Sequence, residues 1–181
     1  MEKILTKKSR IITEKIIYIA ITVVFAVALP QLVHIIGRLT GTNAALGQIL
    51  LPMHIPVLIL GFCAGPWAGL AAGILAPAVS HFLTGMPASA LLPYIAAETA
   101  GYGLFAGLLK DAKLHPIIKI ASVQILGRLV RILAALLLSA VMKDNTIAFS
   151  AAIAGMLAGI PEIILQIILV PYIVKKIERS K

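Results

Sequence analysis

Polar side chains recur at helical spacing within three apolar segments in the second half of the chain. Residues three, four or seven positions apart lie on one side of a helix, so each set forms one polar face. The sets are Tyr94, Glu98 and Tyr102; Gln124, Arg128 and Arg131; and Gly155, Gly159, Glu162 and Gln166. Charged groups are costly inside a membrane and usually face a bundle interior or a water-filled cavity. The three faces therefore predict a binding pocket where three helices meet, with buried ion pairs that fix helix register as the alternative.

The helical rise of about 1.5 Å per residue separates the charged residues by height. Arg128 and Glu162 lie ~21 and ~22 Å below the outer ends of their helices, so they are predicted to form a structural ion pair. Arg131, at ~16 Å, and Glu98, at ~10 Å, are less well matched. Arg131 is therefore expected to face a ligand, which its planar fork of donors suits. Glu98 and Gln166 are expected to contact the same ligand, together with the two tyrosines of the first face.

The composition is that of a membrane protein. Of 181 residues, 60% are apolar and 13% are charged, and the mean hydropathy is +1.03. These are too few polar side chains to cover a soluble globule. A helix needs about 20 apolar residues to span a bilayer, and the apolar segments cover residues 16–36, 49–64, 67–83, 91–109, 117–142 and 147–174. The expected fold is all-α, an integral membrane bundle of six transmembrane helices in a single domain over residues 1–181, with a short second helix.

Lysine and arginine residues predict the orientation. One side of the bundle carries Lys3, Lys7, Lys8, Arg10, Lys15, Lys110, Lys113, Lys119, Lys175, Lys176, Arg179 and Lys181, and the other carries Arg38 and Lys143. Basic residues favour the cytoplasmic side, so both termini are expected there, in a multi-pass protein of the cell membrane. The net charge of +9 then serves membrane anchoring rather than nucleic-acid binding. A cleavable signal peptide ending near Ala28 is the alternative, and it would leave five helices.

Glycines occupy every fourth position around Pro66, at Gly61, Gly65, Gly69 and Gly73. Small residues at this spacing let helices approach closely in lipid. We expect close packing at the cytoplasmic end, where the second and third helices meet. The row either packs helices together inside the bundle or forms a docking surface for another protein.

Gln48 and His54 precede this row and are expected at the outer mouth of the pocket. His34 and His81 are also predicted near the outer side, but no HExxH or CxxC spacing supports a zinc site, and interfacial hydrogen bonding is the preferred interpretation. No metal or cofactor is expected. No Walker loop is present, so this chain is not expected to hydrolyse ATP by that route.

Three stretches carry a family resemblance: "LGQILLPMHIPVLILGFCAGPWAGLAAGILAPAVSHFLTGMP", "AAETAGYGLFAGLL" and "AGIPEIILQIILVPYIV". Together they resemble the substrate-binding S component of energy-coupling factor (ECF) transporters, over residues 16–174. The resemblance implies a six-helix protein, not itself an enzyme, that captures a vitamin outside the cell. It also implies a pocket built by helices four to six and the outer loops. The implied partners are a membrane coupling (T) subunit and two ATPase subunits.

In the family, small residues on the early helices dock on the coupling subunit through an Ala-xxx-Ala pattern on helix one. Here Ala20 is followed four residues later by Val24, so the docking face either differs or uses the glycine row. Pantothenate is the first expected substrate and a pyridoxine-like vitamin the second. Two other classes stay open: a stand-alone channel or facilitator, and an intramembrane enzyme that uses Glu98 with the outer histidines.

Overall fold

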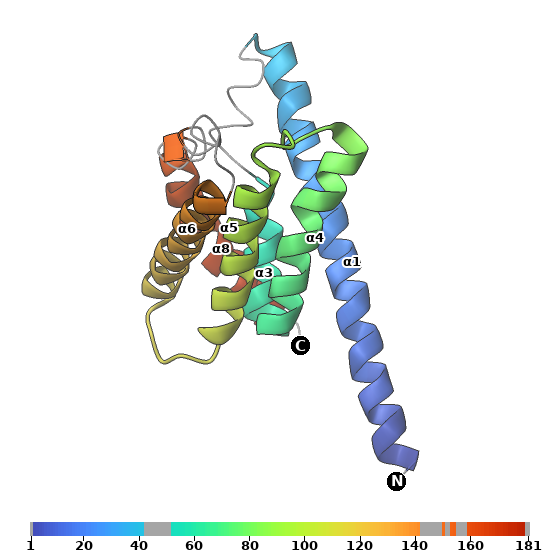
Figure 1. Ribbon diagram of the computed structural model, residues 1–181. Coiled ribbons are helices and arrows are strands. Elements are labelled where there is room, and N and C mark those ends of the chain that lie inside the picture. The colour runs from blue at the N-terminus through green and yellow to red at the C-terminus, as the bar shows by residue number, and fades with distance from the viewer. Residues whose placement is uncertain (1, 42–51, 142–149, 151–152, 155–158, 180–181) are drawn as a thin grey trace.

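The computed structural model describes residues 2–41, 52–141, 150, 153–154 and 159–179, and these residues form helices and turns without a strand. The helices are α1 (Glu2–Leu39), α3 (His54–Ala64), α4 (Pro66–Thr84), α5 (Leu92–Leu108), α6 (Pro116–Val141) and α8 (Ile160–Arg179). They run alternately up and down, and both termini lie at the same end of the bundle (Figure 1). The predicted all-α class is confirmed.

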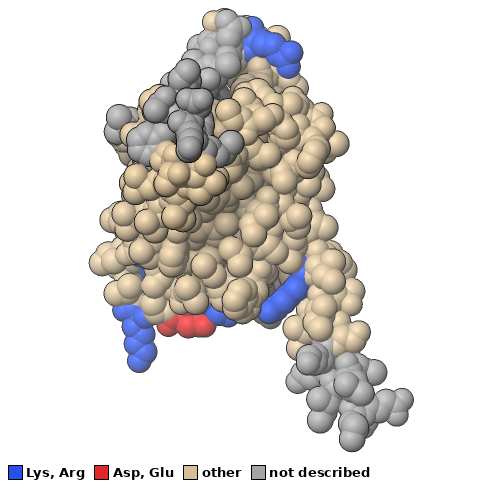
Figure 2. Space-filling model, viewed as in Figure 1, with Lys and Arg blue, Asp and Glu red and all other residues tan. Residues whose placement is uncertain are grey.

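Within the described part of the chain, three helices are long and apolar enough to cross a membrane: α1 over Ser9–Leu39, α4 and α6. Helix α3 is apolar but has only 11 residues, as its position beside Pro66 predicted. Lys and Arg side chains gather at the two ends of the face shown in Figure 2, and the surface between them is free of charged side chains. This distribution is that of a bundle whose middle contacts lipid. Six membrane crossings and cytoplasmic termini stay predictions.

Helix α1 stands at one side of the bundle, and its N-terminal half extends beyond the other helices (Figure 1). It packs against α3 and α4. Its outward residues Ile16, Val24 and Phe25 are 57% to 65% exposed. The helix begins well before the predicted residue 16, and α8 continues five residues past the predicted 174, because hydropathy marks only the apolar part of a helix whose polar end extends into water.

The break between α3 and α4 is set by Gly65 and Pro66. Gly65 has φ 95° and ψ 177°, and its amide donates to the carbonyl of Gly61 at 3.0 Å, which ends α3. A side chain rarely tolerates this positive φ, so glycine is required here. Pro66 then opens α4 at a position where no backbone N–H is needed.

The other three glycines of the row pack on α5. A Cβ at Gly61 would lie 2.5 Å from the carbonyl oxygen of Gly103, and a Cβ at Gly69 or Gly73 would overlap the α5 backbone at Gly103 or Thr99. Thr99 also donates its hydroxyl to the carbonyl of Gly73 at 2.7 Å. The two helices that carry the row do pack on each other, as expected, and the glycines of the row in addition bring both helices close to α5.

Candidate functional site

Four helices contribute buried polar side chains to one region of the bundle, which we call the polar cluster. Its members are His54 from α3, Glu98 and Tyr102 from α5, Gln124 and Arg131 from α6, and Glu162 and Gln166 from α8. Each of these residues is at most 4% exposed. Buried polar groups need partners, and the cluster provides them in two hydrogen-bonded groups.

The first group, the Glu98 group, joins α5 to α6. Arg131 donates through Nη1 to Glu98 Oε2, and the two side chains form a buried ion pair. The Tyr102 hydroxyl donates to the other carboxylate oxygen, Oε1, at 2.8 Å. Glu98 and Tyr102 lie four residues apart on one helix face, which places both side chains together. Both oxygens of the carboxylate are thus bonded.

A glycine on α6 makes room for this group. A Cβ at Gly127 would overlap the ring of Tyr102, and a Cβ at Gly101 would lie 3.1 Å from the Cα of Gly127. The backbones of α5 and α6 therefore approach closely at this level. Gly127 positions the Tyr102 ring although it has no polar group of its own.

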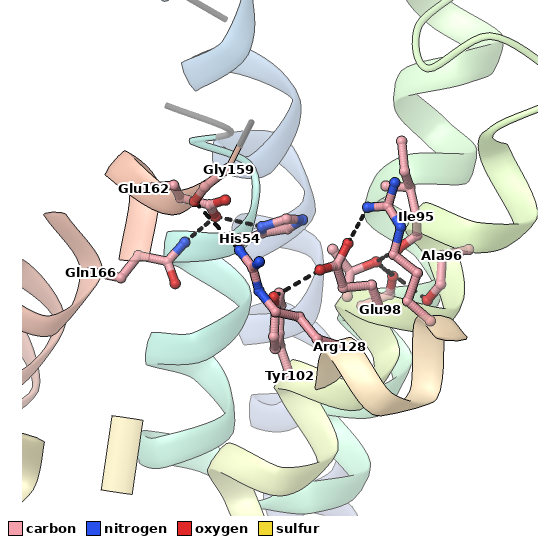
Figure 3. Close-up of polar contacts among 12 residues, drawn as sticks. His54, Ile95, Ala96, Glu98, Tyr102, Arg128, Gly159, Glu162 and Gln166 are labelled. Atoms are coloured by element: carbon pink, nitrogen blue, oxygen red, sulfur yellow. Dashed lines mark hydrogen bonds and ion pairs between the residues drawn. The ribbon is translucent and has the colours of Figure 1, made fainter. Parts of the chain in front are cut away.

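The second group, the Glu162 group, joins α3, α6 and α8. His54 donates through Nδ1 to Glu162 Oε1 at 2.5 Å. Gln166 Nε2 donates to the same oxygen, and Gln124 Nε2 donates to Gln166 Oε1. Glu162 and Gln166 are again four residues apart, so one helix face supplies both. His54 crosses from the short helix α3 to complete the group (Figure 3).

The two groups meet at their aromatic rings. The rings of His54 and Tyr102 are 5.0 Å apart in an edge-to-face arrangement. Arg128 lies between the groups in Figure 3 and donates through Nη2 to the carbonyl of Gly159 at 3.4 Å. The cluster is thus one continuous polar region.

Two buried polar atoms of the cluster have no hydrogen-bond partner among the described residues: Arg131 Nε and Gln124 Oε1. Leaving a buried polar group unsatisfied costs about 1 to 3 kcal/mol. The atoms are one donor and one acceptor, and they lie on the same helix, α6. They are the two atoms of the cluster whose hydrogen-bonding capacity the described residues leave unused.

The structure shows charge pairings that heights along the helices did not favour, whereas the Arg128–Glu162 pair and ligand contact by Arg131 stay predictions. Arg131, expected to face a ligand, is paired with Glu98, and Glu162 is bonded to His54 and Gln166. Heights measured from the predicted outer end of each helix do not include the reach of an arginine side chain or the rotation of each helix about its axis.

The remaining predicted residues fall in different places. Tyr94 is fully buried and packs with Ala135, one helical turn before Glu98 on α5. His54 lies within the polar cluster, whereas the ring of His81 donates to the carbonyl of Pro87 at 2.8 Å. Ala20 is exposed on α1. Gln48 and Gly155 lie outside the described residues.

The sequence predicts Gln124 as part of a polar face but does not single it out as a site residue. It bonds Gln166 and carries one of the two unsatisfied atoms. Its spacing from Arg128 and Arg131 was the available signal. Within the described ranges, no three His, Cys, Asp or Glu side chains are arranged to hold a metal ion.

Comparison with protein families gives one match. A family model described as "ECF transporter, substrate-specific component" matches residues 12–174, which is most of the chain. No curated protein and no solved structure matches the sequence.

Proposed function

Because the chain belongs to the substrate-specific components of ECF transporters, we propose that the polar cluster is where it captures a water-soluble vitamin or vitamin precursor for import. The observation that carries this proposal is the pair of unsatisfied buried atoms, Arg131 Nε and Gln124 Oε1, within a bonded polar region. Intramembrane polar residues mark substrate pathways by default. Here they come from four helices and converge on one place.

The chemistry of the cluster suits a ligand with both donors and acceptors. Arg131 and Arg128 can bond a carboxylate or a ring acceptor, and arginine is well suited to planar acceptors. Gln124 and Gln166 can bond an amide or hydroxyl in either direction. Pantothenate has a carboxylate, an amide and hydroxyls, so it stays the first candidate. A pyridoxine-like vitamin, with a ring nitrogen and hydroxyls, is the second.

Arg131 and Glu98 can contact a substrate while they stay paired with each other, provided that the ligand bonds the guanidinium of Arg131 at Nε. The Glu98 carboxylate then holds Arg131 in place from the other side. Gln166 and Tyr102 are placed beside these residues and are proposed to contact the same ligand. Ligand capture at the polar cluster does not require contact by Tyr94 or Gln48. It also does not require His54 to lie at the mouth of a pocket.

Docking on a coupling subunit is proposed for the exposed face of α1. Ala20 and Val24 lie on that face, and Val24 is 65% exposed. Gly61, Gly69 and Gly73 are buried against α5 and have no free surface for a partner. We therefore assign the glycine row to packing within the bundle. The coupling subunit and two ATPase subunits would supply the energy for import.

A binding screen tests the function. The purified chain in detergent is titrated by calorimetry with a panel of B vitamins and their precursors, pantothenate and pyridoxine included. We expect one compound to bind with 1:1 stoichiometry, and the Gln124→Met variant to weaken the same isotherm. If a compound binds the parent and Gln124→Met equally well, the polar cluster is not the capture site. If no compound binds, the vitamin assignment is wrong.

A further inference from the structure

A groove of about 600 Å³ opens between the start of α6 and the end of α8, at the end of the bundle that holds both termini. We call it the lysine groove. Its apolar floor includes Phe62, Ile120 and Val170, and its rim carries Lys110, Lys119 and Lys175. None of these residues belongs to the polar cluster.

The rim is positively charged and partly fixed in place. Three lysines and one acid, Glu178, line the groove, so its formal charge is 3 − 1 = +2 with His115 neutral. Lys119 is half-buried, and its ammonium donates to the carbonyl of Lys110 at 2.6 Å. A lysine ammonium has three donors, so two stay available for an anion.

The groove continues into the apolar outer surface of α8. Ile168 and Tyr172 both line the groove and are each 68% exposed. Apolar side chains at this level of a membrane bundle face acyl chains, and tyrosine is favoured where acyl chains meet headgroups. A cationic rim thus adjoins an apolar path that leads along the helix toward the middle of the bundle.

We propose that the lysine groove binds one anionic phospholipid. The phosphate of the headgroup lies between Lys119 and Lys175, and an acyl chain follows Ile168 on α8. Basic pockets between transmembrane helices are suited to such headgroups. A free phosphate ion would use the rim but leave the apolar floor without a role, so the lipid accounts for both features.

The lipid would also connect two helices of the polar cluster. Ile120 and Val170, in the floor, lie one helical turn from Gln124 and Gln166, which bond each other across α6 and α8. A headgroup held by Lys119 of α6 and Lys175 of α8 would hold the same two helices together. This binding is independent of which vitamin the chain captures.

Native mass spectrometry of the chain in detergent tests the proposal, with phosphatidylglycerol and phosphatidylcholine of identical acyl chains as probes. We expect one phosphatidylglycerol to be retained preferentially. Lys175→Gln should weaken its retention by about fivefold, the change that corresponds to about 1 kcal/mol for one lysine near a membrane surface. Lys176→Gln is the matched control, because this neighbouring lysine does not line the groove, and it should retain the lipid as the parent does.

Three results would overturn the proposal. Equal retention of the two lipids would show that the charge of the headgroup is not recognised. Equal weakening by Lys175→Gln and Lys176→Gln would indicate diffuse attraction to the basic end of the bundle. Displacement of phosphatidylglycerol by millimolar glycerol 3-phosphate would show a phosphate site without a role for the acyl chain.

Discussion

Glu98 and Arg131 form a buried ion pair, so changing either residue alone leaves a charge inside the protein. Arg131→Met is expected to lower the free energy of unfolding by about 3 to 5 kcal/mol. The double variant Glu98→Gln with Arg131→Met removes both charges and keeps an acceptor for the Tyr102 hydroxyl, so it should be clearly more stable than Arg131→Met. Thermal unfolding in one detergent measures the difference. A double variant that unfolds at or below the temperature of Arg131→Met would contradict this account.

Gln124 is the residue whose change should affect binding with little effect on the buried charges. Its Oε1 has no partner in the described part of the chain, and its Nε2 bonds only a neutral amide. Gln124→Met fills a similar volume but removes both polar atoms. We expect it to weaken vitamin binding by about tenfold or more, which corresponds to about 1.4 kcal/mol.

Ser139→Ala is the control for Gln124→Met. Ser139 lies on the same helix, and its hydroxyl bonds the carbonyl of Leu136 away from the polar cluster. Calorimetry should give this variant the affinity of the parent. If the parent, Gln124→Met and Ser139→Ala bind the vitamin with equal affinity, Gln124 is not part of the binding site.

At the residue scale, sequence predicted which polar side chains are buried but not which of them pair. The four-residue spacings of Glu98 with Tyr102 and of Glu162 with Gln166 produce direct hydrogen bonds within a helix, and helical periodicity contains that information. Contacts between helices depend on rotation and on side-chain reach. His54 shows the limit most clearly, because its partner Glu162 is 108 residues away.

At the element scale, the glycines of the row are required for two different physical reasons. Gly69 faces the α5 backbone, where a Cβ would overlap Gly103, whereas Gly65 has open space within 4 Å but a φ of 95°. Gly65→Ala should therefore cost about 1 to 3 kcal/mol of backbone strain. Gly69→Ala forces α4 and α5 apart and should be the more destabilising change, since close contact is what holds helices together in lipid.

Thermal unfolding of the two glycine variants in the same detergent compares these effects. Ala20→Gly is a suitable reference for a change between the same two residue types, because Ala20 is exposed on α1. A Gly69→Ala protein that matches the parent in stability would show that α4 and α5 can separate without loss of stability.

The sequence predicted the glycine row and the break at Pro66. It could not predict that α5 is the partner, because spacing within one segment says nothing about which other segment it faces.

At the scale of the whole molecule, the chain combines a buried polar cluster with membership of the family of ECF transporter substrate-specific components. A component of this kind works with partners, so the isolated chain is expected to bind its vitamin without concentrating it. The chain has no Walker loop, and uptake against a gradient requires an energy source. The exposed apolar face of α1 is the surface proposed for the coupling subunit.

Vesicles that contain the purified chain alone, loaded with ATP and exposed to the vitamin that binds, provide the decisive measurement. We expect radiolabelled vitamin to bind up to the number of protein molecules and no further. Vesicles that also contain the coupling subunit and both ATPase subunits should accumulate vitamin above the outside concentration, and Gln124→Met should abolish most of this uptake at low vitamin concentration. Equilibration of the vitamin across vesicles with the chain alone would identify a stand-alone facilitator, because a binding component without its partners has no route to release substrate inside. Accumulation above the outside concentration without partners would contradict the dependence on ATPase subunits altogether.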